Sequence, residues 1–447
     1  MGIYAERCDP REYGFQFSDQ QLSRLSLKMK RCNYTSYVKA MYKPIQAAMK
    51  NNGRPSQYPR ELRWFYHANI DRLGIPPKYI RAYKKARRLL GNIKRSLLKK
   101  VKNPDHPKRT HLPRIRYIDI ARGIAMLCII LGHLGVSAID RVVYTFHVPI
   151  FYIFTGYFIS SRLSPGEFAR RKARTLLVPY AVTCGAIVAL AAVIAVVTGG
   201  NPIEAVKGWL YASAYGSGGD YFRPFYIKRI GAIWFLLATF WGSVFLRMSL
   251  EWRMPLRLAG VTGIFLAGWL TAKRLFWFPL SIQAGCCAAL FMYAGYCARQ
   301  CMDDARHLPR EGKAALTVLA TAVWIAFIAQ YKSFWLVQCD VGRGVIDIVG
   351  CLCACYCVVL ISRLLDAKTR IISGWLAYLG RYSLIMLCIH VTEMNLIDWW
   401  QLVGWLQGKD LPYMLCGGTA VVAKLALNIG GTVLLSRSDF VRRLFAL

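Results

Sequence analysis

Long apolar segments alternate with short, mostly basic connections through the chain after residue 117. A helix that crosses the hydrocarbon core of a bilayer needs about 20 mostly apolar residues, and many of these segments approach that length. The fold class that we expect is therefore all-α, a polytopic membrane bundle formed by residues 113–440. The pattern predicts about ten transmembrane helices, at residues 118–137, 142–161, 176–198, 231–246, 258–271, 277–297, 314–330, 344–362, 373–397 and 413–435.

Residues 1–112 do not share this pattern, and we expect them to form a basic, mostly helical cytoplasmic extension. Within it, residues 82–101 (AYKKARRLLGNIKRSLLKKV) place Leu and Ile on one helical face and Lys and Arg on the other. Such a helix is suited to lying on an anionic lipid surface, although it could also be a linker helix packed on its own domain. The first fourteen residues have no apolar core, so we expect no cleaved signal peptide.

The net charge of +36 is concentrated at the N-terminal end. Residues 1–117 hold 28 Lys and Arg against 7 Asp and Glu, and so contribute +21. Such a surplus is found in nucleic-acid-binding proteins and in proteins that contact anionic membranes. In membrane proteins, Lys and Arg also accumulate on the cytoplasmic side. We expect this second explanation, with anionic lipids and no nucleic acid as partners.

The distribution of Lys and Arg also predicts the orientation. With the N-terminus inside, the cytoplasmic connections and the C-terminal tail hold 18 Lys and Arg, and the outer connections hold 10. We therefore expect a multi-pass protein of the cell membrane with both termini in the cytoplasm.

The 15 Cys lie mostly in apolar segments, as in CLCACYC (residues 351–357). Their spacing favours helix packing over a metal site or disulfides.

Three polar residues share one face of the first predicted helix. Arg122 and His133 are eleven residues apart, so they lie within about 20° of each other and about 16 Å apart along the axis. Asp119 falls on the same side. Ionisable groups in an apolar helix usually face an interior cavity. His133 is the candidate general base, because imidazole exchanges protons near neutral pH. Arg122 suits an anionic donor, or it could simply pair with Asp119.

Two further histidines lie in other predicted spans. His147 precedes Pro149, which frees a backbone carbonyl and opens polar space. His390 lies one turn before Glu393, whose carboxylate could fix the tautomer of the imidazole. A structural hydrogen-bond cluster between helices is an alternative for this pair.

A basic run, ARRKART, precedes the third predicted span and supplies Arg171, Lys172 and Arg174. These side chains could hold the phosphates of a nucleotide-like donor. The accumulation of Lys and Arg on the cytoplasmic side of membrane proteins would by itself also predict such a run.

Arg343 lies four residues before Asp347, a spacing at which helical residues pair, and we interpret this pair as a structural clamp.

Six motifs, in order, resemble the acyltransferase-3 family of integral-membrane O-acyltransferases. The first is RGIAMLCIILGH, an Arg and a His separated by ten residues, preceded by Ile-Asp. The second is TFHVPIFYIFTGYF, which contains His147 and Pro149. The others are RRKARTLLVPY, IWFLLATF, FPLSIQAGCCAALFMYAGY and LGRYSLIMLCIH. Thr155 and Gln283 depart from the family pattern, in which Ser and an acidic residue are more usual.

The resemblance implies transfer of an acyl group, usually acetyl, from cytoplasmic acyl-CoA to a glycan hydroxyl at or beyond the outer face. It implies acetyl-CoA as co-substrate, His133 and Arg122 as essential residues, and the basic run as the site of the CoA phosphates. We expect an O-acetyltransferase that modifies a cell-envelope or exported polysaccharide. His133 would act as a base in direct transfer, or it would carry the acyl group covalently.

Two other functions are compatible with the residues. A transporter or flippase of glycan intermediates would also use intramembrane Arg, His and Glu, and would typically contain internal repeats. A non-catalytic membrane scaffold would depend on the basic residues 1–112 and not on His133.

Overall fold

The computed structural model describes residues 115–301, 310–409 and 412–445, and the predicted N-terminal extension lies outside them. The described residues form helices and no β-strand, with one isolated bridge between Tyr221 and Ile227. The first helices are α6 (Arg116–Gly132), α7 (Ser137–Val143), α8 (Pro149–Tyr157), α9 (Pro165–Val197), α10 (Pro202–Tyr215), α11 (Trp234–Ser249), α12 (Met254–Arg274) and α13 (Ile282–Gln300). The remaining helices are α15 (Arg310–Ala329), α16 (Val345–Lys368), α17 (Ile371–Arg381), α18 (Ser383–Leu396), α19 (Trp399–Gln407), α20 (Tyr413–Ser436) and α21 (Asp439–Leu444).

Six of the described helices are long and apolar enough to cross a membrane: α9, α12, α13 with the short turn before it, α15, α16 and α20. The bent pair α17 and α18 makes a seventh if it is one broken span. The predicted first and fourth spans correspond to α6 and α11, which have 17 and 16 residues and are shorter than the roughly 20 residues of a full crossing. The described part of the chain is therefore all-helical and typical of a membrane protein, with fewer full-length spans than the ten predicted.

The prediction of one continuous helix at 142–161 is wrong. Helix α7 ends at Val143, α8 begins at Pro149, and residues 144–148 form turns between them. Pro149 stands in the first turn of α8, where its missing N–H costs nothing. The side chains of Thr145 and His147 donate to backbone carbonyls of the preceding turn, with Thr145 Oγ1 2.6 Å from the Val142 oxygen. The break places His147 in the turn just before the short helix α8.

The predicted span at 373–397 is also interrupted. Helices α17 and α18 meet at Tyr382 with a bend of 72°. The backbone of Tyr382 leaves the helical region, at φ −103° and ψ 19°. The bend separates the packing of α17 on α6 from the part of α18 that carries His390 and Glu393.

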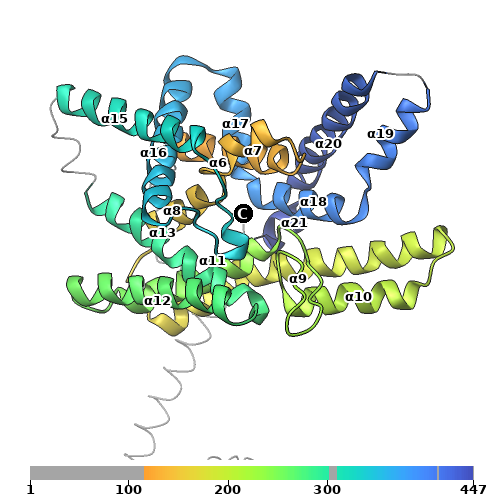
Figure 1. Ribbon diagram of the computed structural model, residues 1–447, viewed down its shortest axis with the longest axis horizontal. Helices are drawn as coiled ribbons and strands as arrows, with labels where there is room; N and C mark the ends of the chain where they lie inside the picture. The colour runs from red at the N-terminus through yellow and green to blue at the C-terminus, as the bar shows by residue number, and fades with distance from the viewer. Residues whose placement is uncertain (1–114, 302–309, 410–411, 446–447) are drawn as a thin grey trace, which may run out of the picture. The chain divides into compact units, whose positions relative to one another are not determined.

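The basic run and the third predicted span form a single helix, α9, of 33 residues. Its start is fixed by a capping box, in which the Ser164 hydroxyl accepts from the Glu167 N–H and the Glu167 carboxylate accepts from the Ser164 N–H. Arg171, Lys172 and Arg174 thus occupy the second and third turns of a rigid element. Figure 1 shows α9 running alongside α10.

Glycines allow two close helix crossings. A Cβ at Gly123 of α6 would lie 2.1 Å from the Leu376 carbonyl oxygen of α17, and one at Gly380 would lie 1.7 Å from the Asp119 carbonyl oxygen. A similar crossing joins α8 and α13 at Gly156 and Gly295. Small residues at helix contacts are typical of membrane proteins, because lipid gives no hydrophobic drive for helix association and close packing replaces it. The α6–α17 crossing fixes the end of α6 that carries Asp119 and Arg122.

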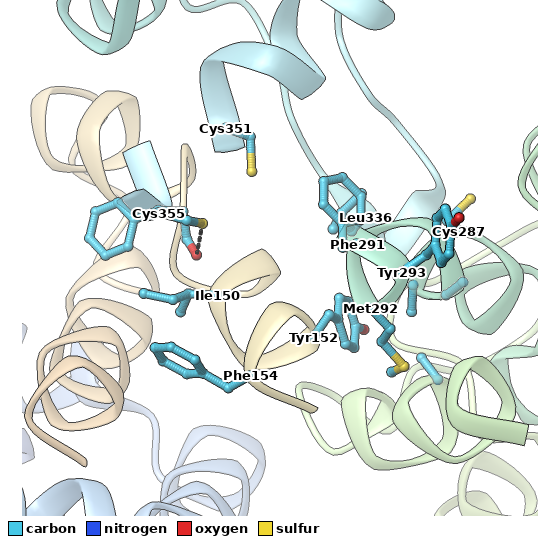
Figure 2. Packing of buried hydrophobic residues seen from close by; sticks show 14 of the residues in the cluster. Ile150, Tyr152, Phe154, Cys287, Phe291, Met292, Tyr293, Leu336, Cys351 and Cys355 are labelled. Atoms are coloured by element: carbon cyan, nitrogen blue, oxygen red, sulfur yellow. Dashed lines mark hydrogen bonds between the residues drawn. The ribbon is translucent and has the colours of Figure 1, made fainter. Parts of the chain in front are cut away.

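The main core cluster surrounds α8, where apolar side chains from both sides of the short helix are buried. Figure 2 shows Ile150 and Phe154 on one side of it and Tyr152 on the other, towards Met292 of α13. The thiol of Cys355, on α16, lies 3.9 Å from the Phe146 carbonyl oxygen. Cys351, Cys355 and Cys357 are buried in helix contacts, as their spacing predicts.

Candidate active site

His133 caps the C-terminal end of α6 and lines a cavity. The helix ends at Gly132, and the His133 N–H bonds to the Ile130 carbonyl. The ring atom Nδ1 lies 2.7 Å from the Ile129 carbonyl oxygen. Because a carbonyl oxygen only accepts, the neutral imidazole carries its hydrogen at Nδ1 and its lone pair at Nε2. The side chain is exposed and forms part of the cavity wall.

The cavity has a volume of about 940 Å³, which is large enough for a sugar-sized or larger ligand. Its wall brings together His133, His147 and Lys424 from three parts of the chain. The other polar or aromatic side chains in the wall include Tyr144, Arg229, Trp234, Trp335, Asn395, Asp398, Trp399 and Trp400. Polar hydrogen-bonding groups and aromatic rings therefore face the same space.

His390 and Glu393 of α18 stand behind His133. The Nδ1 atom of His390 lies 2.8 Å from Glu393 Oε1, and its Nε2 atom lies 3.4 Å from Nδ1 of His133. His390 is fully buried. With its hydrogen on Nδ1 and directed at the carboxylate, His390 presents a lone pair at Nε2 to the Nδ1–H of His133. The predicted contact between His390 and Glu393 is present, and the three residues form a triad across α6 and α18.

Glu393 receives hydrogen bonds from two more helices. The indole N–H of Trp399, at the start of α19, donates to Oε2. On α20, Asn428 Nδ2 lies 3.4 Å and Lys424 Nζ 3.6 Å from Oε1. Lys424 lies within the predicted span at 413–435, but the sequence does not connect it with Glu393, because the pairing depends on how α18 and α20 pack. No sequence signal distinguished Trp399 or Asn428.

His147 is buried, with 4% of its surface exposed, and lines the same cavity as His133. Its Nδ1 atom lies 2.7 Å from the Val143 carbonyl oxygen, so its lone pair is also at Nε2. The Tyr144 ring packs edge-on against the imidazole at 4.7 Å between centroids. The structure therefore places His133 and His147, from two different predicted spans, at one cavity.

Arg122 and Asp119 lie at the other end of α6, and neither is among the residues that line the cavity. Asp119 is buried, and its Oδ1 atom is 3.9 Å from Arg122 Nη1. The Arg122 guanidinium also lies over the rings of Phe154 and Phe158, at 5.7 and 5.8 Å from their centroids. The Arg122 side chain is 30% exposed. A rigid helix thus separates this cationic group from His133 by about 16 Å along its axis.

The basic run of α9 lies on the same side as Arg122. Arg122 and Arg171 are the charged neighbours of Lys172, and the Lys172 ammonium lies 5.7 Å from the Phe168 ring centroid. Arg171 and Arg174 are exposed. Three cations, Arg122, Arg171 and Lys172, are thereby brought together from two helices, which suits a multiply charged phosphate ligand.

Two other predicted features have structural roles. The Arg343 guanidinium binds Asp347, with Nη2 2.6 Å and Nε 2.9 Å from Oδ1, so the predicted clamp is present. Gln283, where the family pattern favours an acidic residue, accepts from the Phe278 N–H at 2.8 Å and donates to the Phe276 carbonyl at 3.0 Å. Both contacts fix the turn that precedes α13.

Comparison with known proteins identifies the family of the chain. The Acyl_transf_3 family model, described as an acyltransferase domain, matches residues 115–435. No curated protein and no solved structure matches the chain significantly. The matched region covers well over half of the chain and contains α6, the cavity and the basic run. The chain therefore belongs to the acyltransferase-3 family.

Proposed function

We propose that the protein transfers an acyl group, in the first instance acetyl, from cytoplasmic acyl-CoA to a hydroxyl group of a cell-envelope or exported polysaccharide. The observation that carries the proposal is the hydrogen bonding of His133. Its Nδ1–H points to two acceptors, the Ile129 carbonyl and His390 Nε2, so the basic lone pair of His133 is on Nε2. His133 lines a cavity of about 940 Å³. The family assignment supports acyl transfer over transport.

In direct transfer, Nε2 of His133 accepts the proton of the acceptor hydroxyl as that oxygen attacks the thioester carbon. The carbon–sulfur bond breaks, the new ester forms, and the proton passes from Nε2 to the CoA thiolate. The developing imidazolium is stabilised by His390 and, through it, by the Glu393 carboxylate. A positioned general base contributes roughly 10²- to 10⁴-fold to such a reaction.

In the alternative mechanism, Nε2 of His133 attacks the thioester itself. An acyl-imidazole forms, the CoA thiolate leaves, and the acceptor hydroxyl then takes the acyl group. Both mechanisms require the same lone pair on Nε2. They differ in whether an acyl group resides on the protein before the acceptor binds.

The donor is assigned to the other end of α6. Arg122, Arg171, Lys172 and Arg174 would bind the CoA phosphates, and the thioester arm would extend along α6 towards His133. The wall of aromatic and polar groups around the cavity, with Trp335, Trp399 and Trp400, suits the apolar faces and hydroxyls of a sugar. Under the predicted orientation, the basic end faces the cytoplasm and the cavity the outer side.

The proposal is tested by incubating membranes that contain the protein with [14C]acetyl-CoA and envelope polysaccharide from the same cells. Label should appear in the polysaccharide and be released as acetate by mild base, as expected for an ester. Membranes without the protein are the control. Label that stays in acetyl-CoA, or a polysaccharide whose mass does not change, would contradict acetyl transfer to this acceptor class.

A further inference from the structure

Lys424 is a buried cation in the middle of α20. Its side chain is 6% exposed, and Nζ lies 3.6 Å from Oε1 of Glu393. A charged lysine in an apolar span is costly unless an anion balances it. Lys424 also belongs to the wall of the cavity that His133 lines. The family match does not by itself assign a role to this lysine.

The hydrogen bonds around Glu393 favour a carboxylate. Oε1 accepts from His390 Nδ1 at 2.8 Å and from Asn428 Nδ2 at 3.4 Å, and Oε2 accepts from the Trp399 indole. A carboxylate accepts from all three donors, whereas the O–H of a protonated acid would compete with them. Glu393 is 3% exposed, and a buried carboxylate without a cation tends to take up a proton. Lys424 supplies the balancing charge.

The state of Glu393 determines where the protons of the triad lie. A carboxylate holds the hydrogen of His390 at Nδ1, so that His390 Nε2 accepts from His133 Nδ1–H. If Glu393 were protonated, it would no longer accept from His390 at Oε1 with the same strength. If Glu393 instead stayed ionised without a balancing cation, it would favour a second proton on His390. The N–H groups of His390 Nε2 and His133 Nδ1 would then face each other across the 3.4 Å contact. Either change weakens the hydrogen bond that His390 accepts from the His133 Nδ1–H, although the Ile129 carbonyl still accepts from the same N–H. His133 then loses the partner that makes Nε2 more basic and stabilises an imidazolium.

We propose that Lys424 is a positioning residue that keeps Glu393 ionised and thereby keeps His390 as the acceptor of the His133 Nδ1–H, which raises the basicity of His133 Nε2. The proposal rests on the proposed function for its effect on catalysis. Among the described residues, the titratable groups of this cluster come from three helices: His133 on α6, His390 and Glu393 on α18, and Lys424 on α20. Helix α19 contributes the neutral Trp399.

The first experiment measures acetyl transfer by Lys424→Met, which keeps an unbranched side chain one atom shorter and removes its charge. We expect kcat to fall about 10- to 100-fold, the range for partners that orient a reacting group, with little change in KM for acetyl-CoA. The acid limb of the pH profile of kcat should move to higher pH, because Glu393 would then be protonated more readily. Lys424→Arg should recover most of the activity. Lys273→Met removes an exposed lysine from α12 and should have no effect.

A double-mutant cycle separates positioning from substrate binding. If Lys424 acts through Glu393, the variant with both Lys424→Met and Glu393→Gln should be no slower than Glu393→Gln alone. Additive losses, a loss confined to KM, or an unchanged kcat in Lys424→Met would overturn the proposal.

The second experiment does not depend on the acyl donor. Diethyl pyrocarbonate modifies an imidazole nitrogen that carries a lone pair, and mass spectrometry of the purified protein locates the modified histidine. Lys424→Met should slow the modification of His133 several-fold and leave that of His147 unchanged. An unaltered rate at His133 overturns the assignment of Lys424 even if acetyl-CoA proves not to be the donor. If the wild-type protein does not transfer acetyl, but Lys424→Met still slows the diethyl pyrocarbonate modification of His133, only the proposed function is overturned.

Discussion

Nε2 of His390 lies 3.4 Å from Nδ1 of His133, and the two rings meet edge to face with 5.1 Å between centroids. The contact joins the C-terminal end of α6 to the middle of α18. It links the exposed His133 of the cavity wall to a histidine with no exposed surface. The buried Glu393 carboxylate contacts the far side of His390. His133 therefore has a fixed tautomer and is connected to an anion through one intervening histidine.

Replacement of Glu393 by Gln tests whether this anion contributes to catalysis. The amide keeps the size of the side chain but removes the charge that stabilises an imidazolium at His133. We expect kcat to fall about 10- to 100-fold while KM for the donor changes little. Steady-state kinetics of the two proteins provide the measurement. A wild-type kcat for Glu393→Gln at a normal expression level would contradict a catalytic contribution of the Glu393 anion.

The two mechanisms predict different products when the acceptor is withheld. Wild-type protein is mixed with [14C]acetyl-CoA and quenched in conditions that preserve an acyl-imidazole, and the peptides are searched for label. Label on His133 that the acceptor later removes would establish the covalent mechanism. A protein that transfers acetyl rapidly but never holds label would establish direct transfer. His147→Ala serves as a control for label on the neighbouring histidine.

Arg122 should affect the donor rather than the acceptor. Its guanidinium lies on α6 at a distance from the cavity, beside Asp119 and Lys172. Arg122→Gln should raise KM for acetyl-CoA about 10- to 100-fold, because a charge-assisted bond to phosphate contributes roughly 1.5–3 kcal/mol, and should leave KM for the polysaccharide unchanged. Arg257→Gln, on α12, is a matched control. Equal effects of Arg122→Gln on both substrates would contradict the assignment.

The crossing of α6 and α17 should be intolerant of a single methyl group. In Gly380→Ala the new Cβ would meet the Asp119 carbonyl oxygen at 1.7 Å, so backbone must move at a cost of about 1–3 kcal/mol or more. The melting temperature of the detergent-solubilised protein should fall accordingly. Gly374→Ala, on the same helix with nothing within 4 Å of the added Cβ, should be neutral or slightly stabilising. Equal melting temperatures for the two variants would contradict the close crossing.

The sequence determined local relationships well and tertiary ones poorly. Arg122 and His133 were placed on one helix, and Glu393 was paired with His390, because both relationships follow from helical periodicity. Lys424 lies 31 positions beyond Glu393 on a different helix, and periodicity carries no information about that packing. Hydropathy also missed the breaks at residues 144–148 and at Tyr382, because both interrupted segments remain mostly apolar on either side of the break.

The most direct test of the account is the rate of acetyl transfer by His133→Ala compared with wild type, measured in matched membranes at saturating acetyl-CoA. Removal of the imidazole eliminates both the general base and the covalent carrier, while the basic donor site at the other end of α6 stays intact. We expect kcat to fall roughly 10²- to 10⁴-fold with the protein present at normal levels. A His133→Ala protein that transfers acetyl within about twofold of the wild-type rate, well below the effect of a positioned base, would contradict the account.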